Sequence, residues 1–221
     1  MATVMTSGSE SGSGMSNLVR WWNDSSPMDR EYGLIAYRSY RDRIGSLTSR
    51  TSPEKACAVF ALLSPNSDFN GNVRSFQIVM AGFRRKPRRL TVDELQGLRT
   101  YRTCAARAYR ILQGEPPAKV FGPTAPKTWN FYHNLLDPRD VRFVTIDGHM
   151  YNLWRGERSS LNVAAARFKP AVYEEIAGDF KELAKALGLV PNQLQATVWW
   201  AYKRINGIKF DYQIDLDLEL T

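Results

Sequence analysis

Residues 122–150 read GPTAPKTWNFYHNLLDPRDVRFVTIDGHM, and no other stretch of the chain says more about its fold. The pattern predicts a helix over Lys127–Leu136, which ends before Pro138 because proline disfavours helix at the residue that precedes it. A short extended run, Phe143–Ile146, then leads to Asp147. The stretch therefore sets a lysine at a helix start and an aspartate at the edge of a core.

Lys127 and Asp147 are candidate catalytic residues because of these positions. Backbone N–H groups point outward at a helix start, so the place is unfavourable for a cation and suits an amine nucleophile. A carboxylate that follows apolar residues can stabilise a positively charged, sugar-like transition state or activate a nucleophile. Both residues also have ordinary interpretations, which the spacing alone favours. Lys127 would then be a solvated side chain and Asp147 the N-cap of the next helix.

A resemblance to a known family supports the catalytic interpretation. Lys127-Thr128 matches the end of a hairpin motif G-x-G-x-K-[TV], and Ile146–His149 matches an apolar-D-x-H element. Upstream, Leu62–Asn66 (LLSPN) is similar to an L-L-S-x-Q segment. These motifs, and the helix order over roughly residues 28–205, resemble the helix-hairpin-helix DNA glycosylase superfamily, which includes endonuclease III and the 8-oxoguanine glycosylases.

The chain resembles a distant member of that superfamily without an iron–sulfur cluster. Pro123 and Ala125 stand where the family has hairpin glycines, and Asn66 stands in place of the usual glutamine. The two cysteines, Cys57 and Cys104, are too few to hold a cluster. The resemblance implies a mostly α, two-lobe helical glycosylase-like fold with a helix-hairpin-helix element. It also implies double-stranded DNA, with or without modified bases, in the cleft between the lobes.

The function that the resemblance implies is a DNA glycosylase-like activity on a damaged or modified base, with or without Schiff-base lyase activity. Lys127 would attack the sugar C1′ of a flipped nucleotide, and Asp147 would stabilise the developing positive charge and help to activate Lys127. His149 would hold the loop of Asp147 by hydrogen bonding. Trp129 and Tyr132 would line a base pocket or, alternatively, belong to the core. Two alternatives on the same fold are a phage-type enzyme that tailors modified thymines and a non-catalytic DNA-binding protein.

Basic residues gather between positions 84 and 110 of a chain whose net charge is +8. Such a cluster suits contacts with DNA phosphates, although a solvated basic surface is the ordinary alternative. We expect three groups of DNA-binding residues: Arg84, Arg85, Lys86, Arg88 and Arg89 in the basic turn, Asn66 as a wedge in the duplex, and Gly122, Thr124 and Thr128 in the hairpin.

The composition narrows the class of protein. With 221 residues of which 43% are hydrophobic, the chain can bury a core, which excludes a fully disordered chain. No run of about 18 apolar residues occurs, so we expect no membrane span. Cys57 and Cys104 lie in apolar helical patterns, which predicts buried free thiols in an intracellular, reducing compartment: the cytoplasm or nucleoid, or the host cytoplasm if a phage encodes the protein.

The sequence gives no sign of a cofactor or a metal. Only two histidines, His133 and His149, are present, which excludes a histidine-rich metal centre. Phosphate-loop, dinucleotide-binding and zinc-binding motifs are absent. We therefore expect an enzyme without a cofactor. We also expect the protein to act as a monomer.

The domain organisation follows from composition and periodicity. Residues 1–14 are rich in Ser and Gly and predict a disordered leader. Residues 15–221 predict a single helical domain, with an inner lobe at about 50–135 and a second lobe from 15–49 together with 136–221. Thr91 and Glu94 predict a capping box for a short helix. Apolar residues alternate with acids from Ile208 onward, which predicts an extended tail.

Overall fold

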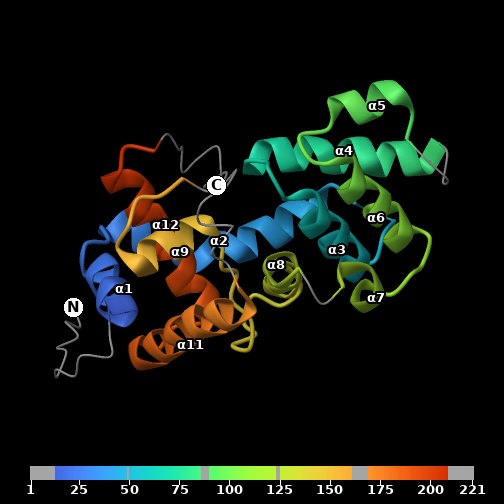
Figure 1. Ribbon diagram of the computed structural model, residues 1–221. Helices are drawn as coiled ribbons and strands as arrows, with labels where there is room; N and C mark the ends of the chain where they lie inside the picture. The colour runs from blue at the N-terminus through green and yellow to red at the C-terminus, as the bar shows by residue number, and fades with distance from the viewer. Residues whose placement is uncertain (1–12, 49, 86–89, 123–124, 161–168, 209–221) are drawn as a thin grey trace. The chain divides into compact units, whose positions relative to one another are not determined.

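The structure is a computed structural model that describes residues 13–48, 50–85, 90–122, 125–160 and 169–208. Over these residues the chain is helical and contains no strand, which confirms the mostly α fold class. The described chain forms two compact units (Figure 1). The terminal unit runs up to Tyr37 and resumes at Asp137, and the central unit is Arg38–Leu136.

The terminal unit is built from α1 (Ser13–Asn23), the first part of α2 (Pro27–Ser46), α9 (Gly148–Arg155), α11 (Pro170–Leu187) and α12 (Pro191–Ile205). The apolar side of α1 packs against α9, α11 and α12. Leu18, Met150 and Phe180 are fully buried in the core that these helices share. The indole N–H of Trp21 donates to the backbone oxygen of Leu153 at 3.2 Å, so a polar contact also ties α1 to α9.

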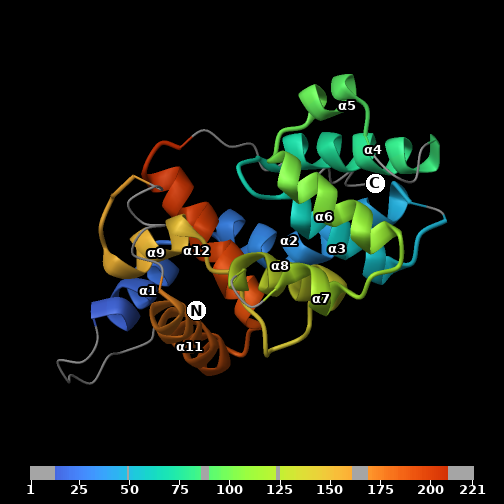
Figure 2. The ribbon, with the colours of Figure 1, turned by 45° about the vertical axis from the view of Figure 1, so that its right-hand side comes forward.

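The central unit is organised around α3 (Pro53–Leu63), whose residues 56–63 are all buried. A helix that is apolar on every side is stable only when other helices surround it. Figures 1 and 2 show α3 among the other helices of this unit, and its packing partners are α4 (Phe69–Arg85), α6 (Arg102–Leu112), α7 (Pro117–Phe121) and α8 (Pro126–Leu136). The short α5 (Val92–Gly97) packs on α4.

Two helices of the central unit begin at recognisable capping residues. Ser52 is the N-cap of α3, and Pro53 is in its first turn, where a missing N–H costs nothing. Thr91 and Glu94 form the predicted capping box of α5, with the Glu94 carboxylate accepting from the Thr91 backbone N–H at 2.7 Å. Arg85 of α4 forms an ion pair with Glu94 and so joins the two helices.

The predicted leader is wrong at its C-terminal end. α1 begins at Ser13, so residues 13 and 14, which we expected to be disordered, are helical. The reason is packing: α1 lies against α9, α11 and α12, and Gly14 within it is so close to Trp154 that a Cβ would lie 2.0 Å from the ring. Residues 1–12, the rest of the expected leader, lie outside the described residues, as do residues 209–221 of the expected extended tail.

Two further expectations concern the cysteines and the membrane. Cys57 and Cys104 are free and buried, as predicted. Burial raises the pKa of the Cys57 thiol to about 11, although the nearby Arg41 charge acts in the opposite direction. Within the described residues, every helix is too short or too polar to cross a bilayer.

Candidate functional site

Lys127 lies in the first turn of α8, where the sequence places it. Its side chain is exposed and forms no ion pair with a described residue. The turn is fixed beneath it, because the backbone oxygen of Ala125 accepts hydrogen bonds from the Trp129 N–H at 3.1 Å and the Thr128 hydroxyl at 3.2 Å. Lys127 is therefore an accessible amine on a rigid helix start.

Gly122 ends α7 with φ +68°, in the left-handed region that glycine adopts most easily. The guanidinium of Arg107 donates to the backbone oxygen of Val120 at 2.7 Å and also to that of Phe121, which satisfies the carbonyl groups at the end of α7. The approach to α8 is thus anchored from α6. Thr124, an expected DNA contact, lies outside the described residues.

Asp147 is the N-cap of α9. Its Oδ1 atom accepts hydrogen bonds from the backbone N–H groups of His149 and Met150, each at 3.0 Å. This is the ordinary interpretation that the sequence left open for this residue. The side chain is half-buried, and its Oδ2 atom accepts no hydrogen bond from a described residue. Asp147 therefore keeps one oxygen available while the other holds the carboxylate in a fixed orientation.

Buried tyrosines hold the segment in front of Asp147. The hydroxyl of Tyr173 donates to the Val144 backbone oxygen at 3.0 Å and accepts from the Ile146 N–H at 3.2 Å. The hydroxyl of Tyr37 donates to Oε1 of Gln195 at 2.9 Å. Burial raises the pKa of both phenols, and the Asp147 charge contributes to the same effect, so both hydroxyls stay protonated.

Sequence reasoning missed these tyrosines. Tyr173 lies on the inward face of α11, where its spacing is that of an ordinary core residue. No motif marks it, since its role depends on two backbone atoms of a distant loop. His149, the supporting residue that the sequence singled out, contacts Asp147 through its backbone N–H, and its ring lies 6.0 Å from the Tyr202 ring.

Trp129 and Tyr132, the expected pocket aromatics, pack inside the central unit. Tyr132 is buried and stacks on Phe121 with ring centroids 5.4 Å apart, and Trp129 meets Phe121 edge-on at 5.5 Å. The His133 ring lies 4.4 Å from the Trp129 ring, centroid to centroid, and is half-buried. Burial raises the pKa of Tyr132 to about 12. This arrangement agrees with the core alternative for the two aromatic residues.

The expected DNA-binding residues lie in several places. Asn66 is exposed in the turn before α4, with φ +61°, a conformation that asparagine tolerates. Arg84 and Arg85 are exposed at the end of α4, and Arg85 is engaged by Glu94. Thr128 is buried, and its hydroxyl donates to the backbone oxygen of Ala125 at the start of α8. Lys86, Arg88 and Arg89 lie outside the described residues.

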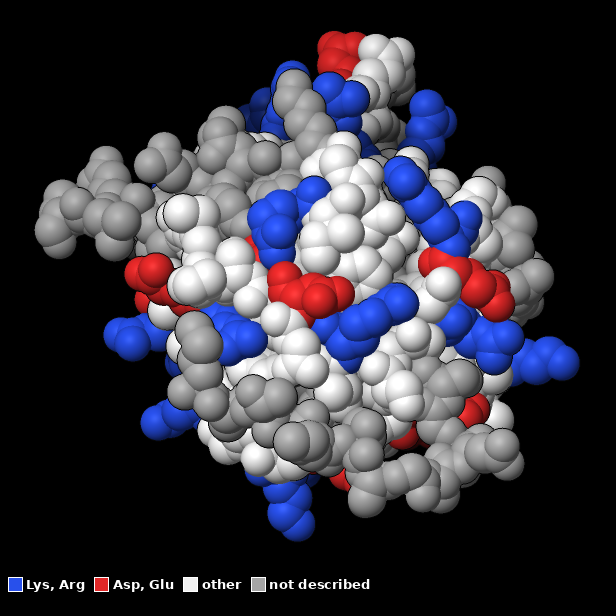
Figure 3. All heavy atoms as spheres, turned by 90° about the vertical axis from the view of Figure 1, so that its left-hand side faces the viewer, with Lys and Arg blue, Asp and Glu red and all other residues white. Residues whose placement is uncertain are grey.

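The charge pattern is broader than this cluster. Figure 3 shows lysine and arginine side chains spread over one face, with aspartate and glutamate side chains among them. Several acids of the chain are paired locally, such as Asp140 with Arg142 at 2.6 Å. No group of three or more potential metal ligands from His, Cys, Asp and Glu occurs among the described residues.

Lys127 belongs to the central unit and Asp147 to the terminal unit.

Comparison with known proteins gives a match to a family: a family model described as "Family of unknown function (DUF7178)" matches residues 1–206. No curated protein and no solved structure matches the chain.

Proposed function

We propose that this chain, which belongs to the DUF7178 family, is a DNA glycosylase-like enzyme that acts on a damaged or modified base in double-stranded DNA. One observation carries the proposal: Lys127 is exposed, forms no ion pair with a described residue, and lies in the first turn of α8, after a left-handed glycine. An exposed amine at the positive end of a helix dipole is suited to attack an electrophilic carbon.

The reaction uses Lys127 as the nucleophile. The C1′–N bond of a flipped nucleotide breaks, and the base leaves with the electron pair and takes up a proton. The Nζ atom forms a bond to C1′ and loses a proton, which gives an amine adduct at the sugar. Opening of the sugar ring converts this adduct into a Schiff base, from which strand cleavage can follow.

Asp147 stabilises the sugar when positive charge develops on it. Its Oδ1 atom is held by two backbone N–H groups, and Oδ2 accepts no hydrogen bond from a described residue. A carboxylate that is already oriented needs no reorganisation when charge appears, and preorganised groups of this kind usually make the largest single contribution to catalysis. The tyrosine contacts around Val144 and Ile146 fix the loop that carries it.

A non-catalytic DNA-binding protein is the second candidate. Its support is the capping role of Asp147, because two backbone hydrogen bonds to α9 account for this residue without any chemistry. The two candidates differ in what the loss of Lys127 does. A non-catalytic binder would release no base even as the wild-type protein, whereas a glycosylase would release a base and lose this activity in Lys127→Ala.

The test is an assay of base release and strand cleavage on duplexes that carry an abasic site or one of several modified bases. Lys127→Ala is compared with the wild-type protein and with Lys119→Ala, a matched control at another exposed lysine of the central unit. We expect Lys127→Ala to abolish strand cleavage and leave duplex affinity within about twofold, because one exposed lysine contributes little to a multi-contact interface. Unchanged cleavage in Lys127→Ala would remove Lys127 from the reaction.

A further inference from the structure

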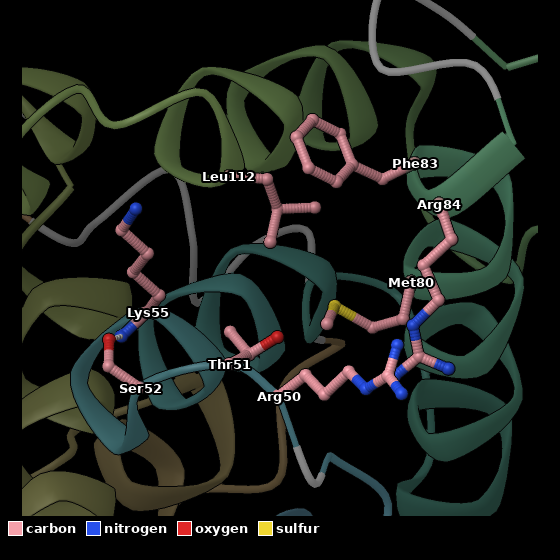
Figure 4. Close-up of a pocket in the computed structure, with 8 residues that line it drawn as sticks. All are labelled: Arg50, Thr51, Ser52, Lys55, Met80, Phe83, Arg84 and Leu112. Atoms are coloured by element: carbon pink, nitrogen blue, oxygen red, sulfur yellow. Dashed lines mark hydrogen bonds between the residues drawn. The ribbon is translucent and has the colours of Figure 1, made fainter.

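The central unit contains a cavity of about 610 Å³, a volume within the usual range for sites that bind small molecules. It lies where the start of α3 meets the end of α4 and the end of α6 (Figure 4). The residues that line it are Arg50, Thr51, Ser52, Lys55, Met80, Phe83, Arg84 and Leu112. No acidic residue is among them.

Three cations surround this cavity without a counter-charge. Arg50, Lys55 and Arg84 form no ion pair with a described residue. Figure 4 shows the guanidinium groups of Arg50 and Arg84 pointing toward one another, with Lys55 on the other side of the cavity. Like charges that converge repel each other, and an anion between them turns this repulsion into attraction. The cavity is therefore suited to a group of high negative charge.

Two hydroxyl groups add to the polar lining. Thr51 and Ser52, the N-cap of α3, both line the cavity. The positive end of the α3 dipole lies at the same place, although Pro53 has no N–H and the Lys55 backbone N–H already donates to the Ser52 hydroxyl at 3.4 Å. Glu54 is in the first turn of α3 but does not line the cavity. Oxygen atoms of a phosphate would find hydroxyl donors here as well as positive charge.

Apolar side chains also line the cavity. Met80 and Leu112 are buried, and Phe83 is half-buried with its ring 5.5 Å from that of Tyr109. A simple anion such as free phosphate would leave this apolar lining unused. A nucleotide has both parts, since its phosphate is anionic and its sugar and base offer flat, weakly polar surfaces that pack against aromatic and apolar side chains.

We propose that this cavity binds a nucleotide, with the phosphate held by Arg50 and Arg84 and the sugar and base against Met80, Phe83 and Leu112. Lys55, on the other side of the cavity, adds to its positive charge. The nucleotide is either a free mononucleotide or one unit of a polynucleotide, and both share this chemistry. The binding does not depend on Lys127 or Asp147, so it goes beyond the proposed reaction. The sequence places Arg84 in a general basic cluster, and only the fold brings Arg50 and Lys55 to the same cavity.

The test is isothermal titration calorimetry with three probes: deoxyadenosine 5′-monophosphate, deoxyadenosine and a single-stranded oligodeoxynucleotide. The cavity variant is Arg50→Gln with Arg84→Gln. The matched control is Arg99→Gln with Arg102→Gln, which removes two exposed arginines of the same unit from outside the cavity. Thermal unfolding of both variants checks that they fold, and Lys127→Ala is included to separate this binding from the chemistry.

We expect deoxyadenosine to bind at least about tenfold more weakly than its monophosphate, because a charge-assisted hydrogen bond contributes about that factor. The cavity variant should lose at least about tenfold in affinity for the monophosphate, the control variant less than about twofold, and Lys127→Ala should bind as the wild type does. If the cavity variant loses affinity for the oligonucleotide alone, and the control variant does not, the bound nucleotide is a unit of a polynucleotide.

Three results would overturn the proposal. The first is equal affinity for deoxyadenosine and its monophosphate, which would remove the role of the phosphate. The second is an equal loss in the cavity and control variants, which would assign the binding to general surface charge. The third is that the cavity variant binds both the monophosphate and the oligonucleotide with the affinity of the wild type.

Discussion

The Oδ1 atom of Asp147 lies 3.0 Å from the backbone nitrogen of Met150, and this contact starts α9. The same carboxylate is the one to which we assign a catalytic role. A single residue therefore serves both the fold and the proposed chemistry, and the two roles use different oxygen atoms. This division makes them separable by mutation.

Asp147→Asn should keep the cap and lose the charge. Asparagine caps helices about as well as aspartate, so the free energy of unfolding should change by less than about 0.5 kcal/mol. Base release should fall by about 100-fold, the usual effect of removing a preorganised electrostatic group. Asp147→Ala should lose both the cap and the charge, and its free energy of unfolding should be lower by about a further 1 kcal/mol. Denaturant unfolding and single-turnover kinetics measure the two effects, and full activity in Asp147→Asn would rule out the catalytic role.

Asp29 and Arg204 form the ion pair that joins α2 to α12 in the terminal unit, with Arg204 Nη2 at 2.7 Å from Asp29 Oδ2. Asp29 is fully buried, and Oδ2 also accepts from the Ser26 N–H at 2.8 Å. Arg204→Gln leaves this carboxylate without its counter-charge, which costs about 3–5 kcal/mol for a fully buried pair. Because the Arg204 side chain is 39% exposed, we expect about 2–3 kcal/mol in denaturant unfolding.

The control for that measurement is Arg38→Gln. Arg38 and Asp42 form a pair on α2 whose side chains are 81% and 71% exposed, and such pairs contribute less than about 1 kcal/mol. If the two substitutions lowered the free energy of unfolding equally, the buried Asp29–Arg204 pair would contribute no more to stability than an exposed pair does.

Gly33 marks the closest approach of α2 to α12. A Cβ at this position would lie 2.0 Å from the Thr197 hydroxyl oxygen and 2.7 Å from the Thr197 Cα. Gly33→Ala should therefore force the helices apart and cost about 1–3 kcal/mol. Gly178→Ala in α11 is the control, since its Cβ would meet nothing within 4 Å. It should stabilise the protein by about 0.5–1 kcal/mol, and a stabilising Gly33→Ala would contradict the close packing.

The stability of the protein should fall at alkaline pH because burial raises the pKa of the Cys57 thiol and of several tyrosines, Tyr37, Tyr132 and Tyr173 among them. The pKa values of Cys57 and Tyr132 rise from the ordinary 9.0 and 10.0 to about 11 and about 12 in the folded protein. From pH 9 upward the unfolded chain therefore loses protons that the folded protein keeps, so the unfolded state binds fewer protons and stability decreases as pH rises toward 12. Each group contributes at most about 1.4 kcal/mol per pH unit.

Denaturant unfolding between pH 8 and about pH 11 measures this loss. In Cys57→Ala the decrease between pH 9 and 11 should be smaller, since the thiol no longer contributes, whereas the part due to Tyr132 remains. If the free energy of unfolding depended on pH equally in the wild type and the variant, the Cys57 thiol would not have the raised pKa that its burial requires.

The local features of this fold follow from the sequence where the signal is local. The start of α8, predicted at Lys127 and found at Pro126, and the capping box of Thr91 with Glu94 depend on neighbours within a few residues. The burial of Cys57 and Cys104 is predicted from the apolar pattern of their helices, and the surrounding helices complete it. The candidate residue Asp147 was found in the same way, because it follows an apolar run. Its capping contact is also local and was anticipated as the ordinary alternative.

The remaining features depend on contacts between distant segments. Gly14 lies in α1 beside the Trp154 ring, and no pattern in residues 1–14 records that contact. The hydroxyl of Tyr173 binds a loop 27 residues away along the chain. The cavity cations Arg50 and Arg84 come from separate segments that only the packing of α3 and α4 brings together.

Borohydride trapping is the most direct test of Lys127 as the nucleophile. Reduction converts a Schiff base between an enzyme amine and an abasic site into a stable covalent adduct, which peptide mapping can assign to one lysine. We expect an adduct at Lys127 with wild-type protein and with Lys119→Ala, and none with Lys127→Ala. An adduct that persists in Lys127→Ala, or no adduct with any duplex while duplex binding is intact, would contradict a lysine-based reaction at this site.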